Sequence, residues 1–119
     1  MHVPRTQGCC GALHAHAGRL DEGIRRAHEL VGALAGYDHI VTNAAGCGSH
    51  LKDHGVDNVV DVSELLGIPR AQRHPLALRV AFQDSCHLRH AQRVSAEPRA
   101  LLDAIDLARQ AGYSSVISH

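Results

Sequence analysis

The sequence has few aromatic residues and no excess of either charge, and both absences restrict its function. Its 119 residues include two tyrosines, one phenylalanine and no tryptophan, and 12 basic residues balance 12 acidic ones. A nucleic-acid-binding surface normally combines a basic patch with aromatic rings on which bases stack. We therefore expect no nucleic-acid partner.

Long hydrophobic runs are also missing. No apolar run approaches the roughly 20 residues of a transmembrane helix, and residues 1–5 lack the apolar segment of a signal peptide. We therefore expect a cytoplasmic protein whose thiols stay reduced. In that setting the four cysteines favour metal binding or catalysis over disulfide bonds.

Several familiar cofactor motifs are absent. The sequence contains no Cys-x-x-Cys, which excludes a zinc ribbon and a thioredoxin motif, and no flavin or dinucleotide fingerprint. Thirty-six residues separate Cys10 from Cys47, and 38 separate Cys47 from Cys86. A common site for these cysteines therefore requires that the fold gather them at one edge of a sheet.

The adjacent residues Cys9 and Cys10 are the most informative feature of the sequence. Neighbouring cysteines do not close an ordinary disulfide without strain. Followed by Gly11, they are suited to present soft sulfur ligands from a tight turn, where glycine lets the backbone approach closely. The alternative is that they are buried as small hydrophobic residues.

The pattern along the chain predicts alternating helices and strands. Apolar residues recur at helical spacing over 20–34, which predicts an amphipathic helix. A β-branched strand at 39–43 then leads into a glycine-rich turn with Cys47, and a short helix follows at 49–54. Backbone N–H groups at that turn are expected to lower the pKa of Cys47, although the glycines could serve only for tight packing.

The second half repeats this order. Strands are expected at 58–62 and 76–83, a brief helix at 63–66, and another helix from Glu97. The strand at 76–83 would deliver Asp84, Ser85 and Cys86 at its carboxyl end, where α/β folds place ligands. The sequence therefore predicts an α/β fold with a mainly parallel sheet flanked by helices. Two partial similar repeats would be joined by a linker near 68–75.

Residues 7–18 resemble the Cys-Cys-Gly segment of the glycolate oxidase iron–sulfur subunit family. That family belongs to the wider group with heterodisulfide-reductase-type cysteine-rich domains. Further motifs at 43–52 and 84–92 agree with it, and 61–66 and 98–102 follow in the expected order. The similarity extends from the first residues to about Leu102.

The resemblance implies an iron–sulfur-binding electron-transfer module with a 4Fe–4S cluster. It implies cluster ligation by Cys9, Cys10, Cys47 and Cys86, with His14, His16, His50, His87 and His90 as accessory candidates. The implied partners are a flavin-containing subunit that oxidises a 2-hydroxy acid and a ferredoxin-type chain. The module itself would be a non-catalytic subunit of a glycolate dehydrogenase complex, held peripherally at the inner membrane through its partners.

Two departures from the family leave alternatives open. The paired ferredoxin-type motifs and a final Cys-Cys-Gly are missing, so we expect residues 1–119 to be a partial, truncated CCG-type domain. It could instead hold a mononuclear zinc or thiol–histidine site, or be a structural remnant without a cofactor. Catalysis by Cys10 with His14 or His16 as base would lack an orienting third group and an oxyanion site.

Overall fold

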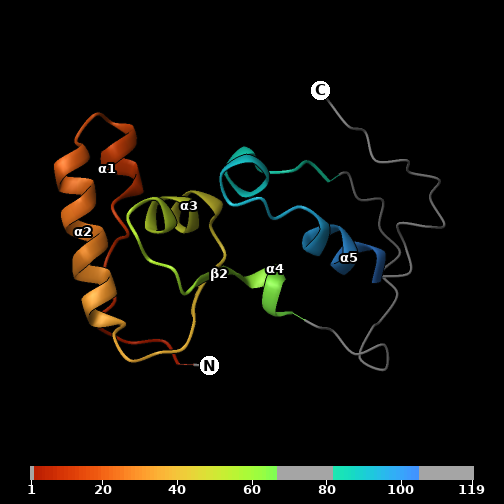
Figure 1. Ribbon diagram of the computed structural model, residues 1–119, viewed down its shortest axis with the longest axis horizontal. Helices are drawn as coiled ribbons and strands as arrows, with labels where there is room; N and C mark the ends of the chain where they lie inside the picture. The colour runs from red at the N-terminus through yellow and green to blue at the C-terminus, as the bar shows by residue number, and fades with distance from the viewer. Residues whose placement is uncertain (1, 67–81, 105–119) are drawn as a thin grey trace. The chain divides into compact units, whose positions relative to one another are not determined.

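The chain folds into helices and a short parallel sheet, distributed over two units. The computed structural model describes residues 2–66 and 82–104 (Figure 1). The units comprise residues 1–61 and 62–119. The expected linker at 68–75, the chain end at 113–118 and most of the strand expected at 76–83 lie outside the described residues.

The first unit begins with a pair of helices, α1 (Ala12–His16) and α2 (Leu20–Ala33). Figure 1 shows α1 folded back beside α2, and the two helices pack against each other. Gly23, Ala27 and Leu30 form the buried face of α2, and Asp21 and Glu22 lie in its first turn, where the helix dipole favours acids. The amphipathic helix predicted at 20–34 is confirmed.

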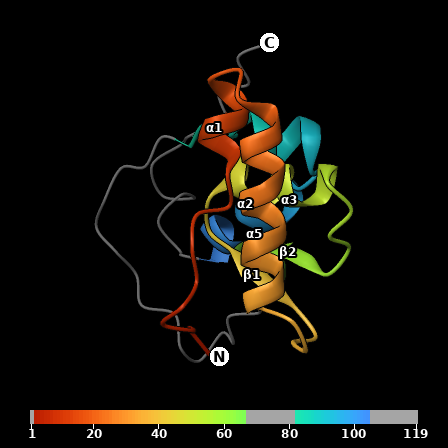
Figure 2. The same cartoon turned by 90° about the vertical axis from the view of Figure 1, so that its left-hand side faces the viewer.

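A strand, a helix and a second strand complete this unit. Strand β1 (Ile40–Thr42) and strand β2 (Val59–Asp61) run parallel, with Ile40 opposite Val59, and α3 (Ala45–Asp53) connects them. The mixed α/β character predicted from the sequence is confirmed, whereas the two similar repeats stay a prediction. In Figure 2, α2 lies in front of α3 and the two strands.

Helix α3 begins earlier than expected. The glycine-rich segment at Cys47 was predicted as a turn before a helix at 49–54, but the helix already begins at Ala45. The amide of Gly48 donates a helical hydrogen bond to the carbonyl of Ala44 at 3.1 Å. Glycine disfavours helix, yet Gly48, Ser49, His50 and Leu51 are buried by this helix, and packing outweighs the local preference.

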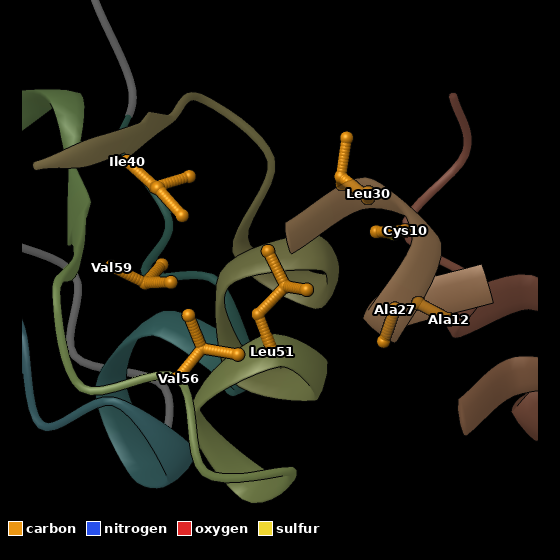
Figure 3. Packing of buried hydrophobic residues seen from close by; sticks show 8 residues of the cluster. All are labelled: Cys10, Ala12, Ala27, Leu30, Ile40, Leu51, Val56 and Val59. Atoms are coloured by element: carbon orange, nitrogen blue, oxygen red, sulfur yellow. The ribbon is translucent and has the colours of Figure 1, made fainter. Parts of the chain in front are cut away.

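The core of the first unit lies where α2, α3 and the strands meet. Leu51 and Val59 are its most completely buried large side chains. Figure 3 shows Leu51 standing between Val59 on the strand side and Ala27 on α2. The full cluster consists of Cys10, Ala12, Ala27, Leu30, Ile40, Leu51, Val56 and Val59. The second cysteine of the Cys-Cys-Gly segment is thus part of the core.

The second unit contains α4 (Val62–Leu65), a π-helical turn η2 (His87–Ala91) and α5 (Ala96–Ala104). Helix α4 packs against α5. Pro98 lies in the first turn of α5, where its missing N–H does no harm. Among the described residues of the chain, no helix has the length and apolar character that crossing a membrane requires.

Candidate functional site

The fold brings together two cysteines that lie far apart in the sequence. The Sγ atoms of Cys10 and Cys47 are 2.9 Å apart, and both thiols are free. A disulfide would have about 2.05 Å between its sulfurs, so this is a pair of thiols in contact. Cys10 precedes α1 and Cys47 lies in the first turn of α3. The convergence expected from the sequence is therefore present for this pair.

Cys9 lies beside the pair but faces differently. Cys10 is 7% exposed and belongs to the core, whereas Cys9 is exposed. The Sγ atom of Cys9 accepts a hydrogen bond from the backbone N–H of Gly11 at 3.4 Å. The two adjacent cysteines thus place one sulfur inside the unit and one at its surface.

The pKa of Cys47 is raised, contrary to the prediction from its helix terminus. Burial, the hydrogen bond with Cys10 and the nearby charges of Cys10 and Cys9 raise the pKa of Cys47 to about 12. Burial penalises a thiolate, and a neighbouring thiolate repels it. The expected lowering by free N–H groups is therefore wrong for the protein with all its thiols free.

A close backbone crossing holds the Cys-Cys-Gly segment in place. Gly11 has φ +87°, and a Cβ atom on it would lie 2.2 Å from the carbonyl oxygen of Gly23 on α2. In return, a Cβ atom on Gly23 would lie 3.0 Å from the carbonyl oxygen of Gly11. Only glycine permits this approach together with this backbone conformation. Gly23 was not among the predicted site residues, although an isolated glycine within a helical pattern is a signal of close packing.

His50 connects α3 to the same crossing. Its side chain is buried, and its Nε2 atom lies 3.2 Å from the carbonyl oxygen of Gly23. The carbonyl can only accept, so the Nε2 atom carries the hydrogen. His50 also meets His54 edge to face, with 4.6 Å between the ring centroids. Of the accessory histidines predicted in this unit, it is the one nearest in sequence to Cys47, one helical turn away.

The remaining predicted histidines lie elsewhere. The Nε2 atom of His14 pairs with Glu22 at 3.3 Å, while its Nδ1 atom is buried with no hydrogen-bond partner in the described part of the chain. His16 is exposed in the first unit, and His87 and His90 lie in η2 of the second. Within residues 2–66 and 82–104, no three His, Cys, Asp or Glu side chains form a ready-made metal-binding group.

Cys86 belongs to the second unit, where it is exposed at the start of η2. The segment that carries it is fixed by Asp84, which accepts hydrogen bonds from Arg99 on α5 and, at 3.4 Å, from Arg89. The Arg99 guanidinium also lies over the Phe82 ring, 5.5 Å from its centroid. Sequence reasoning placed Asp84 in a motif but did not identify this anchor.

A scan against known families matches the stretch that forms this arrangement. The matching description is "CCG: Cysteine-rich domain", over residues 1–52. Residues 1–52 are therefore similar to the CCG family of cysteine-rich domains. The match includes Cys9, Cys10 and Cys47, and the resemblance seen in the sequence is confirmed.

Three relatives extend the similarity beyond the CCG domain. A fumarate reductase (CoM/CoB) subunit of Methanothermobacter marburgensis is 41% identical over 112 residues, covering 88% of this chain and 23% of the relative. The probable glycolate oxidase iron-sulfur subunit of Bacillus subtilis is 34% identical over 125 residues, covering 87% and 28%. The glycolate oxidase iron-sulfur subunit of Escherichia coli is 31% identical over 118 residues, covering 80% and 29%.

The chain therefore spans about a quarter of the length of the curated relatives it matches, with 23%, 28% and 29% of the three covered. No solved structure matches it significantly.

Proposed function

We propose that this chain is an iron–sulfur-binding electron-transfer module. The observation that supports it best is the contact of the Cys10 and Cys47 sulfurs, 2.9 Å apart, inside a stretch that is similar to the CCG family. Two of the relatives above are named as iron-sulfur subunits. A site that gathers thiols from distant segments suits such a role, because cluster iron is held by cysteine thiolates.

The residues present fit an iron–sulfur cluster in their chemistry. Cys9, Cys10, Cys47 and Cys86 are all free thiols, and three of them lie in one unit. The thiol–histidine alternative has less support, because the contact that the fold makes between distant segments joins two sulfurs and not a sulfur and an imidazole. A sulfur-to-sulfur contact in a stretch that matches a cysteine-rich domain favours an iron–sulfur cluster over a mononuclear zinc or thiol–histidine site.

In this proposal the four cysteines are the cluster ligands, and the cluster is of the 4Fe–4S type. When bound, it would accept and pass on single electrons. The chain's own residues shape its surroundings: Cys10 is buried in the core, and Cys9 keeps a surface position. The Gly11 N–H that donates to the Cys9 sulfur is of the kind that tunes cluster potential.

The partners belong to the same proposal. Two relatives are named for glycolate oxidase and one for fumarate reductase, so the named substrates differ. Because this chain resembles all three relatives, the segment that they share is better suited to electron transfer than to recognition of one substrate. We propose that a flavin-containing subunit that oxidises a 2-hydroxy acid supplies the electrons, and that a ferredoxin-type chain takes part in their onward transfer.

Anaerobic reconstitution tests the proposal. The purified full chain is incubated with ferrous iron, sulfide and reductant, then desalted, and its bound iron, acid-labile sulfide and visible absorption are measured. We expect a coloured protein with stoichiometric iron and sulfide. Cys10→Ser and Cys47→Ser should each lose most of both, because each removes one sulfur of the pair.

The matched control is Ala12→Ser, which introduces a hydroxyl into the same buried cluster without removing a sulfur. It should keep the iron content of the native chain. A native chain that stays colourless and iron-free would refute cluster binding and favour a structural role. Metal analysis of the chain as purified tests the other alternative: stoichiometric zinc without sulfide would support a mononuclear zinc or thiol–histidine site.

A further inference from the structure

We infer that His50 is a positioning residue that holds Cys10 against Cys47. The inference goes beyond the proposed function, because it concerns how the metal-free chain assembles the thiol pair. Two residues from other segments approach the carbonyl group of Gly23. Gly11 approaches it with its backbone, and His50 approaches it with its ring.

The first contact fixes the Cys10 side. A Cβ atom on Gly11 would lie 2.2 Å from the Gly23 oxygen and 2.9 Å from the Gly23 carbonyl carbon. The two backbones therefore touch with no side chain between them. Gly11 directly follows Cys10, so the position of Cys10 depends on where α2 presents Gly23.

The second contact fixes the Cys47 side. His50 follows Cys47 by three residues on α3, which places both on the same face of that helix. The His50 Nε2–H donates to the Gly23 oxygen at 3.2 Å, and the residue is only 7% exposed. Gly23 lies within α2, so its carbonyl also accepts the helical N–H of Ala27. The bond from His50 is a second hydrogen bond to the same oxygen, and it ties the position of α3 directly to α2.

The two contacts close a loop through the first unit. From Cys10 it runs through Gly11, Gly23 and His50 to Cys47, and the sulfurs close it at 2.9 Å. Apart from the sulfur contact itself, the hydrogen bond of His50 is the one link of this loop that a side chain makes, so substitution can remove it while the backbone stays intact. Its loss should let α3 shift relative to α2 and separate the thiols.

The experiment measures how closely the two thiols are held. In the full chain carrying Cys9→Ser and Cys86→Ser, only Cys10 and Cys47 can pair. The protein is equilibrated anaerobically with reduced and oxidised glutathione, quenched with acid, and its dithiol and disulfide forms are quantified by mass spectrometry. The reaction is balanced: two protein thiols and one oxidised glutathione give one protein disulfide and two reduced glutathiones. Its equilibrium constant is the effective concentration of the thiol pair.

His50→Ala should lower this effective concentration on the order of tenfold, and His50→Gln, whose amide Nε2–H can donate to the same carbonyl, should restore it. His28→Ala, at an exposed position on α2, is the matched control and should leave it unchanged. Circular dichroism establishes that each variant is folded. If His50→Ala does not fold, His50→Gln decides the question, because a native value supports the inference.

An unchanged effective concentration in folded His50→Ala would overturn the inference. So would a lowered value in folded His50→Gln, because rescue by a donor is what separates positioning from general packing. The measurement involves no iron. A chain that keeps its thiol pair but takes up no cluster would therefore refute the proposed function alone.

Discussion

Replacing Gly11 with alanine tests the close crossing of α1 and α2 that positions the cysteines. Two costs are expected. Alanine in the left-handed conformation at φ +87° costs about 1–2 kcal/mol. The new methyl group would also lie 2.2 Å from the Gly23 oxygen, a backbone atom that cannot rotate away. Such overpacking adds about 1–3 kcal/mol, so the free energy of unfolding should fall by about 2–5 kcal/mol.

The matched control for this prediction is Gly18→Ala. Gly18 also has a positive φ, +80°, but a Cβ atom there would meet nothing within 4 Å. It should therefore show the conformational cost alone, about 1–2 kcal/mol. Urea unfolding followed by circular dichroism gives both values. Equal losses for the two variants would show that Gly11 and Gly23 do not touch, and would remove the structural basis given above for the Cys10–Cys47 contact.

Three further predictions concern charge and exposure. Desolvation raises the pKa of Glu22, but Arg26, Arg19 and His14 outweigh it and lower that pKa below 4.5. The stabilisation is therefore present above pH 4.5 and lost as the pH falls through the lowered pKa. In Glu22→Gln, the melting temperature should therefore fall less on acidification than it does in the native chain. The same pH dependence in both proteins would contradict this role of Glu22. Because burial and the neighbouring thiols raise the pKa of Cys47 to about 12, iodoacetamide at neutral pH should alkylate it more slowly than exposed Cys86. Peptide mass spectrometry measures both rates, and equal rates would refute the reasoning. Finally, Asp84→Asn weakens the ion pair with Arg99, so hydrogen exchange in α5 should accelerate by more than in Arg89→Ala, which removes only the longer 3.4 Å contact. Equal acceleration would show that Asp84 does not anchor α5.

The parts of the fold that the sequence predicted correctly depend on local patterns. Helix α2 was predictable because its apolar spacing and its acidic first turn lie within one segment. Strands β1 and β2 were predictable from short β-branched runs. The start of α3 was not, because glycines at 46 and 48 argue against helix locally. Burial of Ser49, His50 and Leu51 against distant segments decides the outcome.

In the candidate site, too, local sequence predicts where a residue lies, whereas its chemistry depends on contacts with distant segments. The sequence indicates that Cys47 lies where a strand passes into a helix, and such a terminus lowers a thiol pKa. It does not show that a second sulfur will lie 2.9 Å away. This contact, together with burial, raises the pKa of Cys47 instead of lowering it.

For His50 the sequence indicates a histidine one turn after a cysteine, and either metal ligation or hydrogen bonding would use a ring nitrogen. The choice depends on the carbonyl of Gly23, 27 residues away, which the α1–α2 crossing carries to that nitrogen. Spacing within a motif can therefore nominate a side chain, but the segment that packs opposite it assigns the role.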